Sequence, residues 1–182
     1  MLNEENTRTA GKREKWFNKK FRFDLSNEHY GSVLLKLREN PDRISKLVST
    51  LSTEVLTKKV DGKWSIQENV GHLIDLEELH DARIDDFIQK KERLRPADLN
   101  NRKTEDANHN SKKIVDLLKQ LKEVREHFIK RMKHLDDKAL SHSAIHPRLN
   151  QPMKPIDMAQ FVLDHDEHHI GTIEELIKEI SP

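Results

Sequence analysis

The sequence contains no cysteine among its 182 residues. Disulfides, iron–sulfur clusters, thiolate zinc sites and a cysteine nucleophile are therefore excluded, and any bound metal must be held by histidine and carboxylate side chains. Glycine and proline are few, at five and six. Because no glycine-rich turn follows an apolar strand, the chain has neither a P-loop nor a dinucleotide-binding fingerprint.

The chain also lacks long apolar runs and an excess of either charge. Its N-terminus is polar, and no stretch approaches 18 apolar residues, so we expect no signal peptide, no membrane partner and a cytoplasmic protein. The 33 basic and 32 acidic side chains give a formal charge of +1 with histidine neutral. This balance provides no protein-wide field for nucleic acid, which we do not expect as a partner.

Apolar residues make up only 34% of the chain, but they recur at helical spacing, which argues against disorder. In the first such segment the apolar positions are Val33, Leu34, Leu37, Ile44, Leu47, Val48 and Leu51. Asn40-Pro41 interrupts them, and asparagine suits an N-cap while proline suits the first helical position. We therefore predict a short helix before Asn40 and a longer one starting there.

Two further helices are indicated by their first turns. Ser65 and Glu68 form a capping box, which predicts a helix over residues 65–89. Residues 91–103 are polar and form a long connection. The two acids after Thr104 suit the first turn of a third long helix, because the helix dipole favours negative charge there.

The remaining chain completes the predicted architecture. Three prolines break residues 136–155 into an irregular loop, and a last helix is expected over residues 157–180. The fold class is all-α: a four-helix bundle with a long connection between helices 2 and 3 and a short extra N-terminal helix or arm. We place the arm at residues 1–27 and the bundle domain at 28–182.

The predicted arm combines aromatic and basic residues, namely Trp16, Phe17, Lys19, Lys20, Phe21, Arg22 and Phe23. Such a mixture can bind single-stranded nucleic acid. A short segment more often packs its aromatic rings on the domain and leaves its lysines in water, and this is the interpretation we favour.

Two of the chain's histidine pairs have the i,i+4 spacing. His142 and His146 lie in the proline-broken loop, with Pro147 directly after them, so we expect solvated loop histidines. His165 and His169 instead lie in the apolar stripe of the last helix. Burying two imidazoles without partners is costly, and rings one turn apart can offer two nitrogens to one metal. This pattern favours a metal site over two core histidines.

The helix over residues 65–89 offers further polar groups beside its apolar stripe. His72 lies at the edge of the stripe, whereas Glu77 and His80 lie within it. A carboxylate on an apolar face is costly unless it is paired. Glu77 could support a metal ligand, act as a base, or form a buried ion pair, for which Arg125 on the third helix is one candidate partner.

Two segments resemble the DinB/YfiT-like superfamily of four-helix metalloproteins. Lys63–Leu73 is similar to its W-S-x-x-E-x-x-x-H-L helix start, and Asp164–Ile170 is similar to its H-x-x-x-H helix. The resemblance implies one divalent ion, usually nickel or zinc, with iron and manganese as alternatives. It assigns three metal ligands: His72, His165 and His169.

The resemblance further implies a metal-dependent enzyme acting on a small molecule, as a hydrolase or a thiol-dependent S-transferase, and a homodimer. A low-molecular-weight thiol is an expected co-substrate in the second case. Three histidines leave an open position on the ion, where water is acidified or a thiol binds as thiolate. The alternative is a non-catalytic, metal-stabilised bundle, whose site four protein ligands would close.

Three residues are candidates for the catalytic proton carrier: Glu77, His168 and His146. Each has a side chain that can exchange a proton near neutral pH when its environment shifts the pKa. His168 also departs from the superfamily pattern by adding a third ring to the last helix, so it is an alternative metal ligand.

Overall fold

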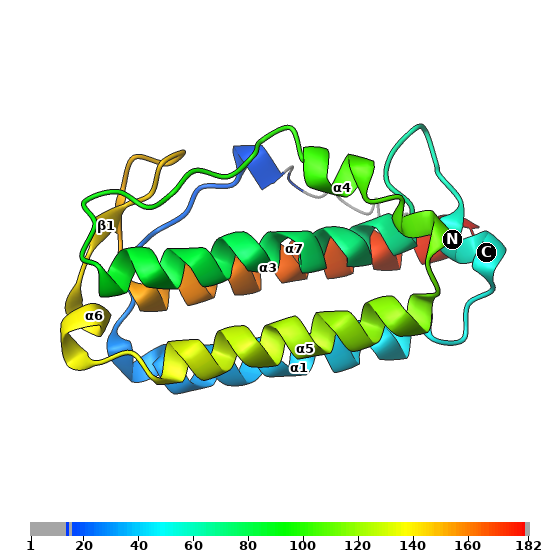
Figure 1. Ribbon diagram of the computed structural model, residues 1–182. Coiled ribbons are helices and arrows are strands. Elements are labelled where there is room, and N and C mark those ends of the chain that lie inside the picture. The colour runs from blue at the N-terminus through cyan, green and yellow to red at the C-terminus, as the bar shows by residue number, and fades with distance from the viewer. Residues whose placement is uncertain (1–13, 15, 181–182) are drawn as a thin grey trace, which may run out of the picture.

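Four long amphipathic helices form the body of the computed structural model, which describes residue 14 and residues 16–180 (Figure 1). They are α1 Tyr30–Val48, α3 Ile66–Ile88, α5 Ile114–Lys133 and α7 Pro155–Ile180. The short helices are η1 Trp16–Asn18, η2 Asn27–His29, α2 Thr53–Thr57, α4 Arg102–Asp106, η3 His109–Ser111 and α6 Asp137–Ser141. A two-stranded antiparallel sheet pairs β1 Ala144–Ile145 with β2 Pro152–Met153. The predicted all-α four-helix bundle is confirmed.

The order of the helices explains the long connection between α3 and α5. Both α1 and α3 pack against α5 and α7, so α1 and α3 lie diagonally across the bundle. The colours in Figure 1 show α3 and α5 running in one direction and α1 and α7 in the other. Because α3 and α5 are parallel, residues 89–113 must return along the whole of α3, roughly 34 Å, and they cross its outer face together with the arm.

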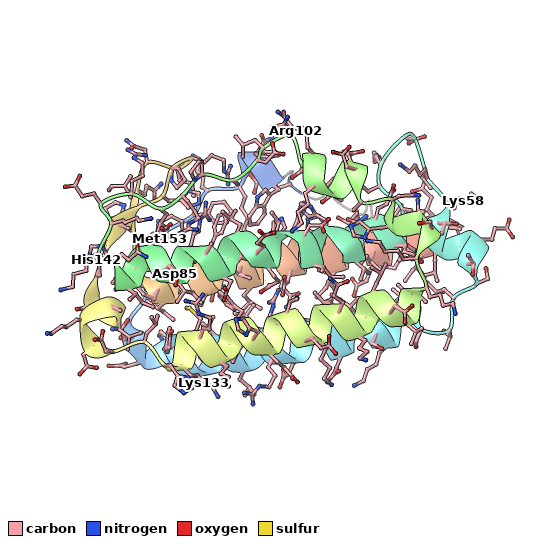
Figure 2. All side chains as sticks on the ribbon, in the orientation of Figure 1. Lys58, Asp85, Arg102, Lys133, His142 and Met153 are labelled. Atoms are coloured by element: carbon pink, nitrogen blue, oxygen red, sulfur yellow. The ribbon has the colours of Figure 1, made fainter. Side chains whose placement is uncertain are left out.

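The core consists of two apolar clusters separated along the bundle axis. One gathers Phe87, Phe128 and Phe161, and the other gathers residues such as Ile66 and Ile173. Side chains fill the space between the four helices (Figure 2). Between the two clusters lies a set of polar residues, one from each long helix, that we call the buried polar layer: Asn40, Glu77, Arg125 and Asp166.

Helix α3 begins as the sequence predicts. The Ser65 backbone N–H donates to Glu68 Oε2 over 2.8 Å, and the Glu68 N–H donates to Ser65 Oγ over 3.1 Å. Farther along, η3 packs closely on α3 at Gly71. A Cβ atom at that position would lie 2.2 Å from His109 Cγ, so this approach of the connection requires glycine.

The predicted break at Asn40 is wrong, because α1 runs through Pro41 without interruption. Asn40 does not cap a helix; its Nδ2 donates to Asp166 Oδ2 over 3.0 Å inside the bundle. Apolar residues on both sides of Pro41 are buried in the two core clusters. Their burial outweighs the cost of a proline within a helix, about 3 kcal/mol.

The predicted start of the third long helix at Thr104 is also wrong. Thr104 belongs to the short α4, and α5 begins at Ile114. The chain turns between them at Asn108, which has a φ of 47°. Gln67 of α3 stabilises this turn by donating to the carbonyl oxygens of His109 and Lys112, over 2.6 and 2.8 Å.

The last helix begins at Pro155, slightly before the predicted start. The Asp157 carboxylate accepts hydrogen bonds from the Lys154 N–H, over 2.9 Å, and from the Leu25 N–H of the arm, over 3.1 Å. The loop expected over residues 136–155 contains α6 and the small sheet.

The part of the arm that the structure describes packs on α7. Phe21 is buried, and the Trp16 ring lies 5.1 Å from that of Phe161. Residues 1–13 and 15 of the predicted arm lie outside the described residues. Among the helices that are described, none has an apolar stretch long enough to cross a membrane.

Candidate metal centre

The antiparallel packing of α3 and α7 brings three histidines together. One nitrogen from each of His72, His165 and His169 lies within 4.8 Å of the others. All three side chains are buried, with exposed fractions of 4%, 7% and 7%. We call this group the three-histidine cluster; it contains the residues that the resemblance assigns as metal ligands.

A hydrogen bond to an amide oxygen fixes the His169 ring. His169 Nδ1 lies 2.8 Å from Asn69 Oδ1. The Asn69 Nδ2 group donates to the Ser65 carbonyl over 2.8 Å, which identifies Oδ1 as the acceptor that faces the ring. Nδ1 is therefore the donor in this contact, and the other ring nitrogen, Nε2, faces His165.

The His72 ring is fixed by a hydroxyl from the connection. His72 Nδ1 lies 3.0 Å from Thr104 Oγ1, and the Thr104 hydroxyl donates to Asp75 Oδ2 over 2.9 Å. The threonine oxygen is therefore the acceptor for the His72 Nδ1–H, and His72 Nε2 has a free lone pair. Burial opposes the charge of Asp75, but hydrogen bonds from His109 and Thr104 outweigh it and lower the pKa of Asp75.

Burial favours the neutral form of two of the rings, those of His72 and His165. Burial lowers the pKa of His72 to about 4. Burial, reinforced by the neighbouring His169, lowers the pKa of His165 well below its usual value. The Nε2 atoms of His165 and His169 lie 3.2 Å apart, while His165 Nδ1 is buried without a hydrogen-bond partner in the described part of the chain.

This donor set fits a divalent transition-metal ion. Free lone pairs on buried nitrogens that converge repel one another unless a proton or a cation lies among them. Neutral imidazole is a good ligand for nickel, zinc and iron. Hydrogen bonds to the far side of a ligating ring, as Asn69 and Thr104 make here, orient the ring and raise its basicity.

The three-histidine cluster lines a cavity of about 1150 Å³. Helices α3 and α7 form its floor, and the connection, the loop at residues 59–64, the loop at 146–148 and the arm form its walls. Both tryptophans of the chain, Trp16 and Trp64, line it. The Trp16 ring lies 4.8 Å from the His165 ring, and the Trp64 ring lies 4.6 Å from the His72 ring.

The two histidines considered as proton carriers, His168 and His146, also line the cavity. His168 is half-buried, and its ring lies 5.4 Å from that of His169. His146 is buried, so the expectation of a solvated loop pair is wrong for it; its partner His142 is half-buried. The Leu149 N–H donates to His146 Nδ1 over 3.2 Å, which holds this ring in the wall.

Glu77 lies in the buried polar layer instead. Its Oε1 is 2.6 Å from Arg125 Nη2, the partner suggested by the sequence. Arg125 also donates to both carboxylate oxygens of Asp166, over 2.7 and 3.0 Å. Burial would raise the pKa of Glu77, but the nearby Arg125 outweighs it and lowers the pKa. Among the described residues, Glu77 is not part of the cavity lining.

Three further polar residues of the cavity were given no role from the sequence: His80, Arg83 and Arg148. His80 Nδ1 lies 3.7 Å from Glu77 Oε1, so this ring lies between the cavity and the buried polar layer. His72, His80 and Arg83 follow helical spacing on one face of α3, which was the available signal. Arg148 comes from the loop between the two strands, and no local pattern marks it.

Solved structures show the same fold. YfiT from Bacillus subtilis, described as a probable metal-dependent hydrolase with an unusual four-helix bundle topology, superposes with a TM-score of 0.76 at 21% identity. The match covers 88% of this chain and 93% of YfiT. A mycothiol-dependent maleylpyruvate isomerase has a TM-score of 0.63 at 14% identity, over 85% of this chain and 67% of the isomerase.

The sequence itself identifies the family. No curated protein shows significant similarity to the chain. The model of the DinB superfamily, however, matches residues 36–173, which include all four long helices in whole or part and the complete three-histidine cluster. The chain therefore belongs to the DinB superfamily.

Proposed function

We propose that the protein is a metal-dependent enzyme that acts on a small molecule, with one divalent ion held by His72, His165 and His169. One observation carries the proposal: three buried imidazoles converge at the floor of a cavity large enough for a small-molecule substrate. Nickel and zinc are the ions we favour, and iron and manganese are the alternatives.

The residues around the three-histidine cluster support catalysis rather than a purely stabilising role. A divalent ion bound there would supply a Lewis-acid centre able to acidify water or a thiol. Asn69 and Thr104 hold the rings in place before substrate arrives. Trp16 and Trp64 cover two of the rings and restrict the access of water.

The reaction is a hydrolysis or a thiol-dependent S-transfer. The absence of cysteine excludes a thiol of the protein as the attacking group, and we propose that this group comes from solvent or from a small thiol. The descriptions of the two similar structures, a metal-dependent hydrolase and a mycothiol-dependent isomerase, are consistent with either source. We propose a homodimer located in the cytoplasm.

The proton carrier is proposed among the histidines of the cavity. His168 is half-buried beside His169, and His146 lies in the loop at residues 146–148 that forms part of the cavity wall. His168 can exchange a proton with a substrate bound beside it. His146, whose pKa burial lowers to about 3, can do so only as a weak base. Glu77, which does not line the cavity, can act only through His80, whose ring lies between Glu77 and the cavity.

Metal content tests the assignment of the ligands. Elemental analysis of protein purified without added metal is expected to give about one divalent ion per chain. His165→Ala should lose the ion while circular dichroism shows a folded bundle. His142→Ala, which changes a histidine outside the cavity lining, should keep it. Full retention of metal by His165→Ala would eliminate the proposed site.

Turnover assays test the reaction class. Metal-loaded protein should be assayed with electrophiles in the presence and absence of small thiols, and with esters and amides. Thiol-dependent turnover that is lost in His169→Ala selects the transferase, and turnover without thiol selects the hydrolase. No turnover on any substrate, together with a fourth protein ligand in a metal-bound structure, supports the non-catalytic metal-stabilised bundle.

A further inference from the structure

The cavity extends from the three-histidine cluster to a second group of cationic side chains. Along α3 its floor passes from His72 by way of His80 to Arg83, eleven residues later, or roughly 16 Å of helix rise. Arg148 and His146 line the same end of the cavity from the loop between the strands. The His146 ring lies 5.1 Å from that of Phe161, one turn of α7 before His165.

Neither arginine has an acidic partner in the described part of the chain. Arg83 donates from Nε and Nη2 to a single acceptor, the Arg95 carbonyl oxygen, over 3.1 and 3.0 Å. Arg148 Nη2 is buried without a hydrogen-bond partner. Asp86 interacts electrostatically with Arg83, but its carboxylate accepts hydrogen bonds from Lys91 and Arg95.

The remaining charged groups of the cavity lining are largely occupied elsewhere. Lys59 lies 2.8 Å from Glu68, and Glu105 accepts a hydrogen bond from the Trp64 indole over 2.7 Å. Asp98 accepts from the backbone N–H groups of Asn100 and Arg102, over 3.0 Å in each case. Lys59 and Lys63 thus have acidic partners, Glu68 and Asp61, whereas Arg83 and Arg148 form no ion pair with another described residue.

The two guanidinium groups lie at the same end of the cavity, and their like charges repel each other unless an anion binds there. Burial, helped by the nearby Arg95 and Arg148 and opposed by Asp86, lowers the pKa of Arg83 to about 10. Burial also lowers the pKa of Arg148. Native proteins leave buried polar atoms unpartnered only rarely, and a guanidinium fork matches the oxygens of a carboxylate or a phosphate.

We infer that Arg83 and Arg148 bind the oxyanion of an elongated small-molecule substrate, a carboxylate or a phosphate, whose other end lies at the three-histidine cluster. The position of the reacting end rests on the proposed function, whereas the oxyanion site does not. Apart from His80, the stretch of cavity between the two groups is lined mainly by apolar side chains, Trp16, Leu76, Leu79 and Phe161 among them. The substrate class is therefore an apolar molecule that carries one terminal oxyanion.

Three ligands of equal chain length test the oxyanion site: hexanoate, hexyl phosphate and the neutral hexanol. Because both tryptophans line the cavity, quenching of tryptophan fluorescence reports occupancy, and calorimetry measures affinity. In metal-free protein at least one anion should bind about 10-fold or more tightly than hexanol, as expected for charged hydrogen bonds. The tighter anion distinguishes carboxylate from phosphate.

Substitutions locate the site. Arg148→Gln should reduce the affinity for the tighter anion to that for hexanol, whereas Arg148→Lys, which retains the charge but not the fork, should give an intermediate value. Lys63→Gln removes the same charge from an exposed lysine of the cavity lining and should change nothing. Circular dichroism should confirm that each variant is folded.

Two outcomes would overturn the inference. One is equal binding of the anions and hexanol by the wild-type protein. The other is an anion affinity that is unchanged in Arg148→Gln, or that falls equally in Lys63→Gln. Since these measurements use metal-free protein, their failure is distinct from failure of the metal site, which elemental analysis of His165→Ala reports.

Discussion

Two buried polar groups lie side by side on α3 and α7 and differ in how their polar atoms are satisfied. In the buried polar layer, Arg125 forms ion pairs with both Glu77 and Asp166, so charges of opposite sign compensate one another in part. In the three-histidine cluster all members are imidazole rings that offer the same kind of atom, a ring nitrogen. The first group is held together by ion pairs within the protein, whereas the second offers nitrogens that a cation could bind.

The difference follows from which side of the helices each group faces. His165 and Asp166 are adjacent in α7, so their side chains point about 100° apart around the helix axis. Asp166 faces the bundle interior, where only other side chains can compensate its charge. His165 faces the cavity, where a ligand can do so. A buried polar group without protein partners is therefore most informative about function when it borders a cavity.

The largest expected effect is in the buried polar layer. Arg125→Ala should lower the free energy of unfolding by about 3–5 kcal/mol, because two carboxylates stay buried without their partner. Metal content per folded chain should not change. Arg131→Ala is a matched control on α5, since Arg131 pairs with Asp81 and Asp85 near the surface and should cost only about 1 kcal/mol. Urea unfolding measures both, and equal costs would contradict the contrast between the layer and the surface.

Glu77→Gln should have a smaller effect of the same kind. Arg125 would keep Asp166 as its partner, so the loss of one charged interaction should cost about 1.5–3 kcal/mol of unfolding free energy. Metal affinity should be unchanged, because Glu77 contacts Arg125 and His80 rather than the three-histidine cluster. A fall in metal affinity without loss of stability would contradict this, because it would show that Glu77 supports the three-histidine cluster rather than the buried polar layer.

Thr104→Val should show the opposite pattern at the three-histidine cluster: a loss of metal affinity with little loss of stability. The near-isosteric change removes the acceptor of the His72 Nδ1–H and should weaken metal binding about 10- to 100-fold, with little effect on unfolding of metal-free protein. Competition with a chromophoric chelator gives the affinity. Thr57→Val is the control, since the Thr57 hydroxyl donates to the Thr53 carbonyl within α2 and lies outside the cavity lining. Equal affinities in the two variants would refute the role of Thr104.

The smallest expected effect is a pH dependence at the oxyanion end of the cavity. Burial, with Arg83 and Arg148 nearby, lowers the pKa of His146 to about 3. As the pH falls, the His146 ring therefore takes up a proton in the unfolded chain before it does so in the folded protein. The contribution of this ring to the free energy of unfolding is fully present above pH 6.5 and is lost as the pH falls towards 3. His146→Asn should reduce the pH slope of the unfolding free energy between pH 6.5 and 5, by at most about 1.4 kcal/mol per pH unit. Parallel wild-type and variant curves would contradict this.

Local signals in the sequence were sufficient for much of the fold. The capping box at Ser65 and the apolar spacing that follows it place α3 to within one residue at each end. The break predicted at Asn40 failed because a local preference for capping competed with burial of the whole helix face. Burial is a property of the assembled bundle, and a single segment does not reveal it.

The candidate site was predictable to a similar extent. Helical spacing indicated that His165 and His169 share a face, and the resemblance added His72; the structure brings the three rings together. Arg148 could not be found in this way, because it lies on a short loop that meets α3 only after folding. Glu77 showed the reverse: its burial was foreseeable from its neighbours, but the choice between a site residue and an ion pair depended on Arg125 from another helix.

The amino-acid sequence by itself determined most of the helical segments, the faces they bury, and that any metal must be bound by histidine or carboxylate. Periodicity and composition are local properties, so they can be read along one chain. The tertiary structure decided which buried polar groups compensate one another and which border a cavity. Those relations join residues far apart in the sequence, such as Asn69 with His169 and Arg125 with Asp166. The walls of the cavity depend on the fold in the same way, because α3 and α5 run parallel and the connection between them must cross the site.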